Sequence, residues 1–366
     1  MAGDIRRDIE RIERVSRVPA HPLGDCLSAG IARADPHTGE IRTLNRYTDL
    51  DFPTRRFMHD RDCLHRFLFE HYPIRGHIIH LDASWRALLE HREYPVAIRD
   101  TLGEAVGASV LLAATLKFDG TLSLQLQGQG PMHLMLAQCT NQLGIRAVAR
   151  YKDEAAVEGL PADLSALSGE GRLMVTLENE DLSQRYQGVV PLEGARLATC
   201  LQGYFENSEQ LPTRLWLYAD ESGVSGMLLQ RLSDDSIASR TGATLEGEAR
   251  PDFDDAWHRV QLLADTLKPQ ELRTLKDREI LQRLFAEDDV RIFESSPVFF
   301  RCRCSRERVI GMLRSLGSDE IRSLLAERGN VEVRCDFCNR AYEFDSVDVE
   351  QIFAAAHQSE AGGTIH

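Results

Sequence analysis

Four cysteines near the end of the chain form two closely spaced pairs, Cys302-x-Cys304 and Cys335-x-x-Cys338. Thiolates contributed from two places in a sequence can close a tetrahedral zinc site, with Zn–S distances of about 2.3 Å. Each pair is also close enough in sequence to oxidise to a local disulfide. Most static structural sites of this kind use two C-x-x-C pairs, whereas the C-x-C pair crowds two thiolates and offers a tight disulfide once the metal leaves. The spacing therefore leaves both a static zinc site and an oxidant-sensitive one open.

The segments around these cysteines predict a small module that a metal ion must stabilise. Residues 331–334 and 342–344 are expected to form two short strands on either side of the second pair. Between the pairs, apolar residues at helical spacing predict two short amphipathic helices, with Val309, Ile310, Leu313 and Leu316 on the first and Ile321, Leu324 and Leu325 on the second. This is little apolar surface for about 50 residues, whereas structural zinc contributes roughly 10–16 kcal/mol of apparent folding free energy. Loss of zinc is therefore expected to unfold the module.

The first cysteine pair lies in a strongly basic stretch. The sequence RCRCSRER at 301–308 holds four arginines, Arg301, Arg303, Arg306 and Arg308, against Glu307 alone. Four thiolates on one divalent ion leave a charge of about −2, which these arginines would offset. They would also lower the pKa of the thiols and favour thiolates, the form that oxidants attack.

The composition indicates a globular protein with a sizeable core, since 43% of its 366 residues are apolar. The first residues are charged, and the most apolar stretch, residues 106–116, is much shorter than the roughly 18 residues of a membrane helix. We therefore expect a cytoplasmic protein with no membrane partner. The net charge of −14 argues against general binding of nucleic acid, whose phosphates need a basic surface. Eight cysteines without an export signal favour a metal or redox site over a secreted disulfide framework.

An α+β fold is expected for the body of the chain, because helical and strand patterns are mixed from about residue 63 onward. Helices are predicted at 85–91 and 94–118, the second with apolar residues at i, i+4, i+7 and i+8. Residues 121–127 alternate apolar and polar side chains before a Gly128-Gln129-Gly130-Pro131 breaker, which predicts a half-buried strand and its turn. Two antiparallel hairpins are also predicted, from 173–177 with 186–190 and from 215–217 with 227–229, the second turning through 220–223.

Other patterns flank this body. Residues 1–57 are rich in Arg and Asp with scattered prolines, so little packed structure is expected there beyond a marginal helix at 5–15. A polar, turn-rich stretch at 233–255 predicts a domain boundary. Two short helices are predicted beyond it, and both must take stability from a neighbour. One carries Trp257, Val260, Ala264 and Leu267 and ends at Pro269, and the other carries Ile280, Leu281, Leu284 and Phe285, with Asp277 as its candidate N-cap.

Motifs spread along the chain resemble those of the heat shock protein 33 family, the redox-regulated 33 kDa chaperonins. The resemblance runs from about Met58 to near the C-terminus, and the motifs occur in the family's order. They are LHRFLFE (64–70), ATLKFDG (114–120), LQLQGQGPM (124–132), YQGVVPLEG (186–194), SEQLPTRL (208–215), GMLLQ (226–230), CRCSRERV (302–309) and CDFC (335–338).

The resemblance implies an ATP-independent cytoplasmic holdase chaperone, not an enzyme, that is zinc-bound and inactive when reduced. Peroxide with heat, or hypochlorite, would join Cys302 to Cys304 and Cys335 to Cys338, release the single zinc ion and loosen the connecting helices. The apolar surface so uncovered would bind unfolding client proteins, and oxidised members of the family form homodimers. The expected organisation is an extension at 1–57, an α+β chaperone core at 58–242, a helical linker at 243–300, a zinc-binding redox-switch module at 301–350 and a tail at 351–366.

Two features depart from the family. Asn339 stands where the family often has glycine after the last cysteine, and we expect a positive φ there, which Asn tolerates better than most residues. The first 57 residues have no counterpart in the family. Our hypothesis is that Met58 is the natural start and the extension a gene-model artefact, which an intact mass beginning at Met1 would contradict.

Rival functions have weaker signals. The sequence holds no G-x-S-x-G, Walker or dinucleotide-binding motif. His77 and His80 lie in a strand-like stretch at i, i+3 spacing and are interpreted as structural, and the isolated Cys139 and Cys200 as small buried side chains. A thiol–disulfide oxidoreductase would carry C-x-x-C at a helix start, whereas strands flank it here. A static zinc ribbon that binds nucleic acid or protein stays as the alternative, supported by the local arginines and opposed by the net charge.

Overall fold

The structure is a computed structural model that describes residues 61–90, 92–153, 158–160, 163–179, 185–192, 194–233 and 253–361, with side chains described up to residue 354. The expected extension, its marginal helix and Met58 lie outside the described residues, as does most of the polar stretch before the later helices. The described part combines helices with mainly antiparallel sheets, so the predicted α+β fold is confirmed. None of its helices has the length and apolar character needed to cross a membrane.

The first sheet joins the start of the described chain to strands from its middle and its last third. Its order is β10-β1-β2-β9-β8, and β11 also pairs with β1. β8 and β9 form the second predicted hairpin, which closes with a hydrogen bond of 3.0 Å from the amide of Asp220 to the carbonyl oxygen of Gly223. The strands are β1 (Asp62–Phe69), β2 (Ile74–Leu81), β8 (Thr213–Ala219), β9 (Val224–Arg231), β10 (Val290–Ile292) and β11 (Ser296–Pro297).

The second sheet has the order β12-β5-β4-β3-β6-β7. The predicted alternation of β3 is confirmed, with all three of its leucines buried, and β6 and β7 form the first predicted hairpin. The turn after β3 needs glycine, because a Cβ on Gly130 would lie 2.5 Å from the backbone nitrogen of Gly169. The strands are β3 (Gly120–Gly128), β4 (Met132–Thr140), β5 (Gly144–Tyr151), β6 (Gly171–Asn179), β7 (Arg185–Val190) and β12 (Phe299–Phe300), which runs parallel to β5.

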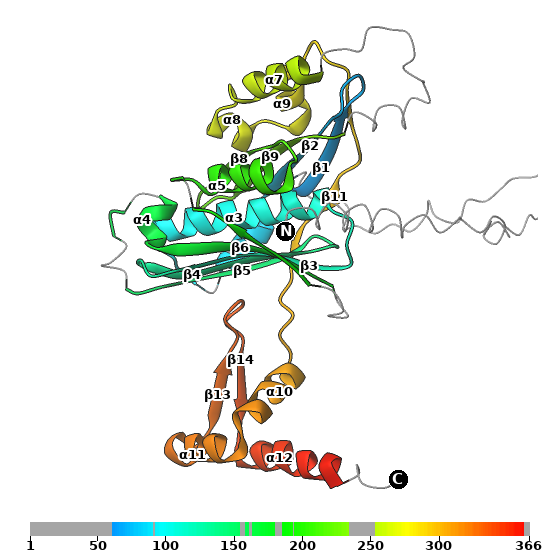
Figure 1. The fold of residues 1–366 in the computed structure, drawn as a ribbon. Helices are drawn as coiled ribbons and strands as arrows, with labels where there is room; N and C mark the ends of the chain where they lie inside the picture. Colours follow the sequence, from blue (N-terminus) through cyan, green and yellow to red (C-terminus); the bar gives the residue numbers. More distant parts are fainter. Residues whose placement is uncertain are drawn as a thin grey trace, which may run out of the picture. The chain divides into compact units, whose positions relative to one another are not determined.

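Helix α3 (Val96–Thr115) lies between the two sheets and is buried on almost every side (Figure 1). A helix that is apolar all round is typical of a core position. The helix predicted at 94–118 is confirmed, but it begins later and ends earlier than predicted. Pro95 has an extended ψ of 145° and occupies the N-cap position, so the helix begins at Val96. The other elements of the body are α2 (Ala83–Leu89), α4 (Leu164–Ser168), α5 (Leu197–Tyr204) and the π-helical turn η1 (Phe205–Glu209).

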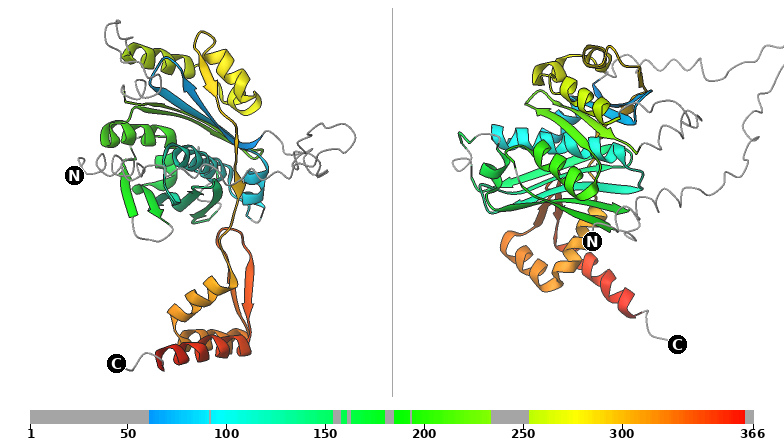
Figure 2. Two further views of the ribbon diagram at one scale, coloured as in Figure 1. Left: turned by 90° about the vertical axis from the view of Figure 1, so that its right-hand side faces the viewer. Right: turned by 45° about the horizontal axis from the view of Figure 1, so that its top comes forward.

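Three short helices cover the face of the first sheet that points away from α3 (Figures 1 and 2). They are α7 (Phe253–Ala264), α8 (Pro269–Thr274) and α9 (Asp277–Leu284). Their apolar residues and those of β1, β2 and β9 form a second buried cluster, separate from the one around α3. The predicted helical faces are therefore buried, and the helices do borrow their stability from a neighbouring sheet.

Two details predicted for these helices are wrong. α7 ends at Ala264, and Pro269 begins α8 instead of ending the helix before it. Proline suits the first position of a helix because its missing N–H would have no partner there. The residue before α9 is Lys276, so Asp277 is the first residue of that helix and not its N-cap.

A third buried cluster follows residue 301. The helices α10 (Arg306–Leu316) and α11 (Ser318–Arg328) and the hairpin of β13 (Val331–Arg334) with β14 (Ala341–Phe344) form as predicted, and α12 (Ser346–Ala361) follows them. Among the described side chains the cluster holds eight buried apolar residues, which are Leu313, Ile321, Val331, Tyr342, Phe344, Val349, Ile352 and Phe353. So small a core agrees with the expectation that the module needs another source of stability.

Candidate metal centre

Two short segments bring the four predicted cysteines together. Cys302 and Cys304 lie between β12 and α10, and Cys335 and Cys338 lie at the tip of the β13–β14 hairpin. All four sulfur atoms lie within 4.8 Å of one another. The Sγ atoms of Cys302 and Cys335 are 3.6 Å apart, and those of Cys304 and Cys338 are 3.4 Å apart. Four sulfurs placed tetrahedrally around one ion at about 2.3 Å would be about 3.8 Å apart, so the arrangement can hold a metal ion.

The hairpin tip is shaped by two backbone hydrogen bonds. The amide of Asn339 donates to the carbonyl oxygen of Cys335 at 2.8 Å, and the amide of Cys335 donates to the carbonyl oxygen of Arg340 at 3.0 Å. This tight turn requires a left-handed residue after the last cysteine, and Asn339 has φ 53°. The positive φ predicted for Asn339 is confirmed.

The segment that carries Cys302 and Cys304, the other arm of the cluster, is held at both of its ends. The amide of Arg301 donates to the carbonyl oxygen of Ile145 at 2.9 Å, which continues the pairing of β12 with β5. Beyond the second cysteine, the hydroxyl of Ser305 accepts a hydrogen bond of 3.3 Å from the amide of Arg308 and caps α10. Cys302 and Cys304 therefore lie on a short segment between a sheet and a capped helix.

Burial and neighbouring groups shift the pKa values of the first two thiols in opposite directions. Burial raises the pKa of Cys302, and the other three thiols add to that effect. Burial acts in the same direction on Cys304, but the hydroxyl of Tyr342 and the other three thiols outweigh it and lower the pKa of Cys304 to about 7. Thiols that are close enough to shift one another's ionisation in this way form one titrating unit.

Two guanidinium groups lie close to the sulfur atoms. Burial lowers the pKa of Arg146, and Cys302 and Cys335 act to raise it, whereas Arg303 and Arg308 act to lower it again. On the other side, Tyr342, Cys304 and Cys338 raise the pKa of Arg340. These two arginines therefore provide positive charge beside the thiols.

The two residues between Cys335 and Cys338 contact the second sheet. A carboxylate oxygen of Asp336 lies 2.5 Å from Nη2 of Arg150, and the other lies 3.5 Å from Nη2 of Arg92. The guanidinium of Arg146 lies 4.2 Å from the ring centroid of Phe337. This contact was not predicted from the sequence. Its signal was the placement of Arg146 and Arg150 four residues apart on β5, which puts both on one face of a strand.

The remaining candidate side chains are packed into the body. Cys139 is fully buried and Cys200 nearly so, as predicted. His77 and His80 are both buried on β2, and their spacing places them on opposite faces of the sheet. Burial lowers the pKa of His77 to about 3, and nearby Arg75 contributes, so its ring is neutral. Neither histidine belongs to a metal-ligand cluster among the described residues.

His80 is part of a buried network that the sequence did not reveal. Its Nε2 lies 2.7 Å from Oδ1 of Asp277, and its Nδ1 lies 3.1 Å from the hydroxyl of Ser225. Nδ1 of His65 lies 2.5 Å from the other carboxylate oxygen of Asp277. Burial alone would raise the pKa of Asp277, but the two histidines outweigh it and lower the pKa to about 2.

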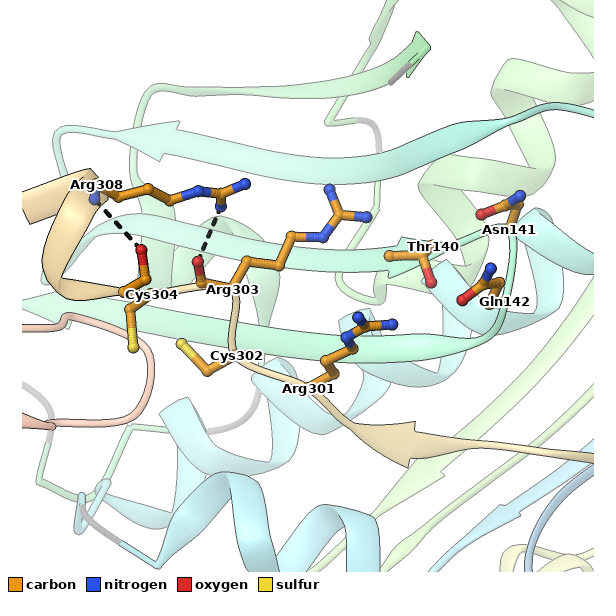
Figure 3. A pocket seen from close by; sticks show the side chains of 9 residues that line it. Thr140, Asn141, Gln142, Arg301, Cys302, Arg303, Cys304 and Arg308 are labelled. Carbon is orange, nitrogen blue, oxygen red and sulfur yellow. Dashed lines mark hydrogen bonds between the residues drawn. The ribbon is translucent and has the colours of Figure 1, made fainter. Parts of the chain in front are cut away.

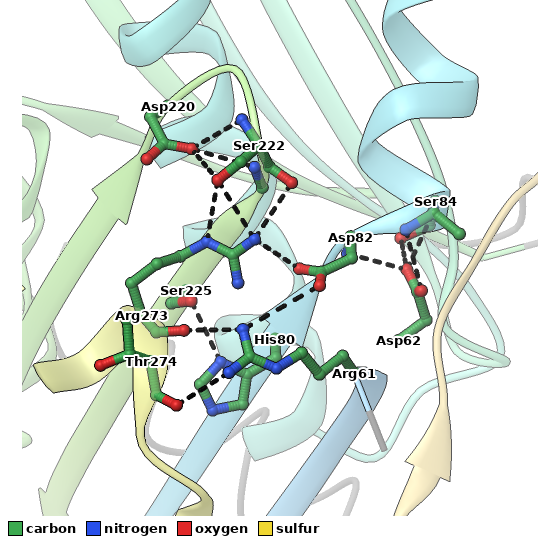
Figure 4. Close-up of polar contacts among 12 residues, drawn as sticks. Arg61, Asp62, His80, Asp82, Ser84, Asp220, Ser222, Ser225, Arg273 and Thr274 are labelled. Carbon is green, nitrogen blue, oxygen red and sulfur yellow. Dashed lines mark hydrogen bonds and ion pairs between the residues drawn. The ribbon is translucent and has the colours of Figure 1, made fainter. Parts of the chain in front are cut away.

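A second polar network joins α8 to the same sheet (Figure 4). Nη2 of Arg273 lies 2.8 Å from a carboxylate oxygen of Asp82 and donates to the carbonyl oxygen of Ser222 at 3.0 Å. Arg61 in turn donates to the carbonyl oxygens of Arg273 and Thr274 at 2.8 and 2.9 Å. The helices that cover the sheet are thus held by ion pairs as well as by apolar contacts.

Comparison with known proteins gives a consistent result. The model of the Hsp33 protein family matches residues 62–345. The 33 kDa chaperonin of Methylobacillus flagellatus is 45% identical over 293 residues, which cover 80% of this chain and 94% of that protein. The 33 kDa chaperonin of Nitrosococcus oceani is also 45% identical, over 309 residues that cover 84% of this chain and all of that protein.

A solved structure shows the same fold. The crystal structure of the 33 kDa chaperonin of Thermotoga maritima, a heat shock protein 33 homologue, matches with a TM-score of 0.67. The match covers 81% of this chain and 100% of that chain at 22% sequence identity.

Proposed function

The chain belongs to the Hsp33 family, as its motifs predict, and from this premise we propose that it is a redox-regulated, ATP-independent holdase chaperone. In this proposal it acts in the cytoplasm and binds unfolding client proteins without catalysing a reaction. The reduced chain is inactive, and the oxidised chain forms a homodimer and binds clients. The proposal excludes nucleic acid and membranes as partners.

The close approach of four thiols is the observation that carries this proposal. Cys302, Cys304, Cys335 and Cys338 would hold one zinc ion in the reduced chain, because four thiolates in tetrahedral reach of one point suit zinc. Bound zinc would supply the folding free energy that the small buried cluster of the module lacks. The proposed zinc-binding module comprises residues 301–350, followed by a tail at 351–366.

Oxidation acts on the thiols in this proposal. Each of two peroxide molecules accepts two electrons from a pair of zinc-bound thiolates, whose sulfur atoms join in a disulfide. The O–O bond of that peroxide breaks, and with two protons from the solvent it leaves as two molecules of water. The family resemblance pairs Cys302 with Cys304 and Cys335 with Cys338, and zinc is released because its four ligands are consumed. The shortest sulfur separations in the structure join the two arms instead, so peptide mapping of the disulfides is part of the test.

The proposed linker at 243–300 separates the module from the chaperone core at 58–242, and it contains the helices α7 to α9 and the strands β10 to β12. The helices cover apolar residues of the first sheet, with Trp257, Val260 and Ile280 among the buried side chains. Short helices of this kind are stable only while they pack against a partner. Loosening of the linker after the module unfolds would expose both the helices and the sheet face, which gives clients an apolar surface.

A chelator assay for released zinc, run beside light scattering of a heat-denaturing client, tests the proposal. Peroxide at raised temperature should release about one zinc ion per chain and suppress aggregation of the client. Cys335→Ser should abolish zinc binding, disorder the module and give partial activity without oxidant. Cys200→Ala, which alters a cysteine outside the cluster, should keep both the zinc and the response.

A static zinc ribbon, the alternative, predicts that zinc stays bound under oxidation. Zinc retained under oxidation, with no change in scattering, would contradict the redox switch. Salt-dependent binding of DNA or RNA by the same zinc-loaded chain would then support a nucleic-acid function, for which the arginines around the cysteines are the favourable observation.

A further inference from the structure

A polar cavity of about 450 Å³ lies beside Cys302 and Cys304 (Figure 3). Its walls come from the β4–β5 turn and from the segment that leads into α10. Three guanidinium groups line it, and no carboxylate does. The lining side chains that matter here are Thr140, Asn141, Gln142, Arg301, Arg303 and Arg308.

Hydrogen bonds fix the main chain at Arg301 and Arg303 and the side chain of Arg308. The amide of Arg301 continues the pairing of β12 with β5. Figure 3 shows the Arg301 side chain extending toward the turn that carries Asn141 and Gln142. Nη1 of Arg308 donates to the carbonyl oxygen of Arg303 at 2.9 Å. A guanidinium has five N–H donors, so this one contact leaves most of the donors of Arg308 for another acceptor.

Neutral donors complete the lining. Thr140 is buried, and its hydroxyl oxygen accepts a hydrogen bond of 3.0 Å from the amide of Gly144. That contact fixes the oxygen and leaves the hydroxyl proton to be donated. The side-chain amide of Asn141 donates to Asp119 at 2.8 Å. Glu307 hydrogen-bonds with Ser305 in the same way, so each nearby carboxylate is held by a neutral side chain of the lining and neither lines the cavity itself.

The charge of the cavity is not accounted for by the thiols alone. Arg146 interacts electrostatically with Cys302 and Cys335, and Arg340 with Cys304 and Cys338, so two other guanidinium groups already offset charge on the thiols. Arg303 and Arg308 add repulsion to Arg146. An anion placed among these positively charged groups would reduce their mutual repulsion. The stabilisation is largest where water is partly excluded.

We propose that this cavity binds a small multivalent oxyanion of the phosphate type. Planar guanidinium groups match the oxygens of such an anion in paired hydrogen bonds, and the N-terminal end of α10 adds partial positive charge. A long polyanion fits less well, because the chain carries a net charge of −14 that repels it beyond the cavity. Anion binding in this cavity would be independent of the chaperone function.

Calorimetric titration of the reduced, zinc-loaded full chain with pyrophosphate tests this site. Saturable binding of one pyrophosphate per chain is expected at about 0.15 M salt, weakening as salt rises. The double variant Arg301→Gln with Arg303→Gln should bind at least about tenfold more weakly, since two charge-assisted contacts are lost. Arg328→Gln removes an exposed arginine from α11 and should leave the affinity unchanged.

Further measurements distinguish a loss of the anion site from a loss of the fold of the module. Zinc content is measured for every variant, and Arg308→Gln, which lies farther from the cysteines, repeats the test if the double variant loses zinc. No saturable binding to the wild-type chain, or equal binding by the arginine variants, would overturn the proposal. Tighter binding of an oligothymidylate of about ten nucleotides through the same arginines would also overturn it, in favour of nucleic acid.

Discussion

At the scale of single residues, Asp277 connects helix α9 to the first sheet. One of its carboxylate oxygens contacts the ring of His80 on β2, and the other contacts the ring of His65 on β1. Asp277 is almost fully buried. A buried charge is tolerated only with such partners, because removing one partner leaves the others without compensation. The network therefore opposes the departure of α9 from the sheet.

Replacing Asp277 with Asn should weaken this attachment by about 2–4 kcal/mol, because the histidines lose a charged acceptor in a buried site. Urea unfolding gives the loss of stability, and hydrogen exchange should show faster opening of residues 253–285 than of the body. Glu287→Gln, in the exposed turn after α9, serves as the control and should behave as the wild type. Equal exchange in both variants would show that apolar packing alone holds the helices.

The same carboxylate predicts a dependence on pH. The pKa of Asp277 is lowered to about 2 from a usual value of 3.8, so the folded state favours the ionised form. Its contribution, about 2 kcal/mol, is complete above the unfolded pKa and is lost as pH falls toward the folded pKa. The difference in unfolding free energy between the wild type and Asp277→Asn should therefore shrink between about pH 5 and pH 2.5. A difference that stays constant over this range would contradict the assignment.

At the scale of elements, the β13–β14 hairpin has two roles at one tip. Its cysteines face the other arm of the cluster, and the residues between them contact β5 through Asp336 and Phe337. A metal ion that orders the tip would also order these contacts, since no residue separates the ligands from the docking side chains. Binding of a metal ion and contact with the sheet would thereby be coupled.

Reversing the charge of Asp336 with Asp336→Arg should break the contact with Arg150 while zinc stays bound. The pair is half exposed, so the loss is roughly 0.2–1 kcal/mol, but peroxide should release zinc several-fold faster because the tip opens more often. Adding Arg150→Asp should restore the slower rate by re-forming the pair. Glu320→Gln on α11 provides a variant with a lost charge outside the contact. Failure of the double variant to recover would show that the contact does not control zinc release.

At the scale of the whole molecule, stability is divided unequally. The cluster around α3 draws on both sheets, the linker cluster uses one face of the first sheet, and the cluster after residue 301 has eight buried apolar residues among the described side chains. Regions with few buried contacts open at lower free energy than the core. The module should therefore unfold first and the body last.

Removal of zinc by a strong chelator from the reduced chain should unfold the module and leave the body folded. Hydrogen exchange is expected to become fast for residues 306–354, while α3 and the strands of both sheets keep their protection, because zinc contributes roughly 10–16 kcal/mol to such a site. Adding zinc back should restore protection. Protection that survives chelation would mean that the module folds on its apolar cluster alone.

Local patterns in the sequence were sufficient for many of the elements. The alternation along β3, the breaker after it and the two later hairpins follow from side-chain period and turn chemistry, which need no distant partner. The cysteine spacing and the positive φ of Asn339 are local as well. For Asp277 a local signal also existed. It shares a helical face with Ile280, Leu281 and Leu284, which indicates a buried position, but it was interpreted as an N-cap.

The sequence by itself thus determined the family, the α+β class, the cysteine cluster and most of the regular elements around it. Only the tertiary structure decided which strands share a sheet, that β2 is buried on nearly every residue, and which charges meet across long stretches of chain. Asp277 reaches His80 and Asp336 reaches Arg150 only because packed layers bring their elements together. The physical reason is that side-chain periodicity encodes which face of an element is buried, whereas its partner is chosen by the packing of the whole chain.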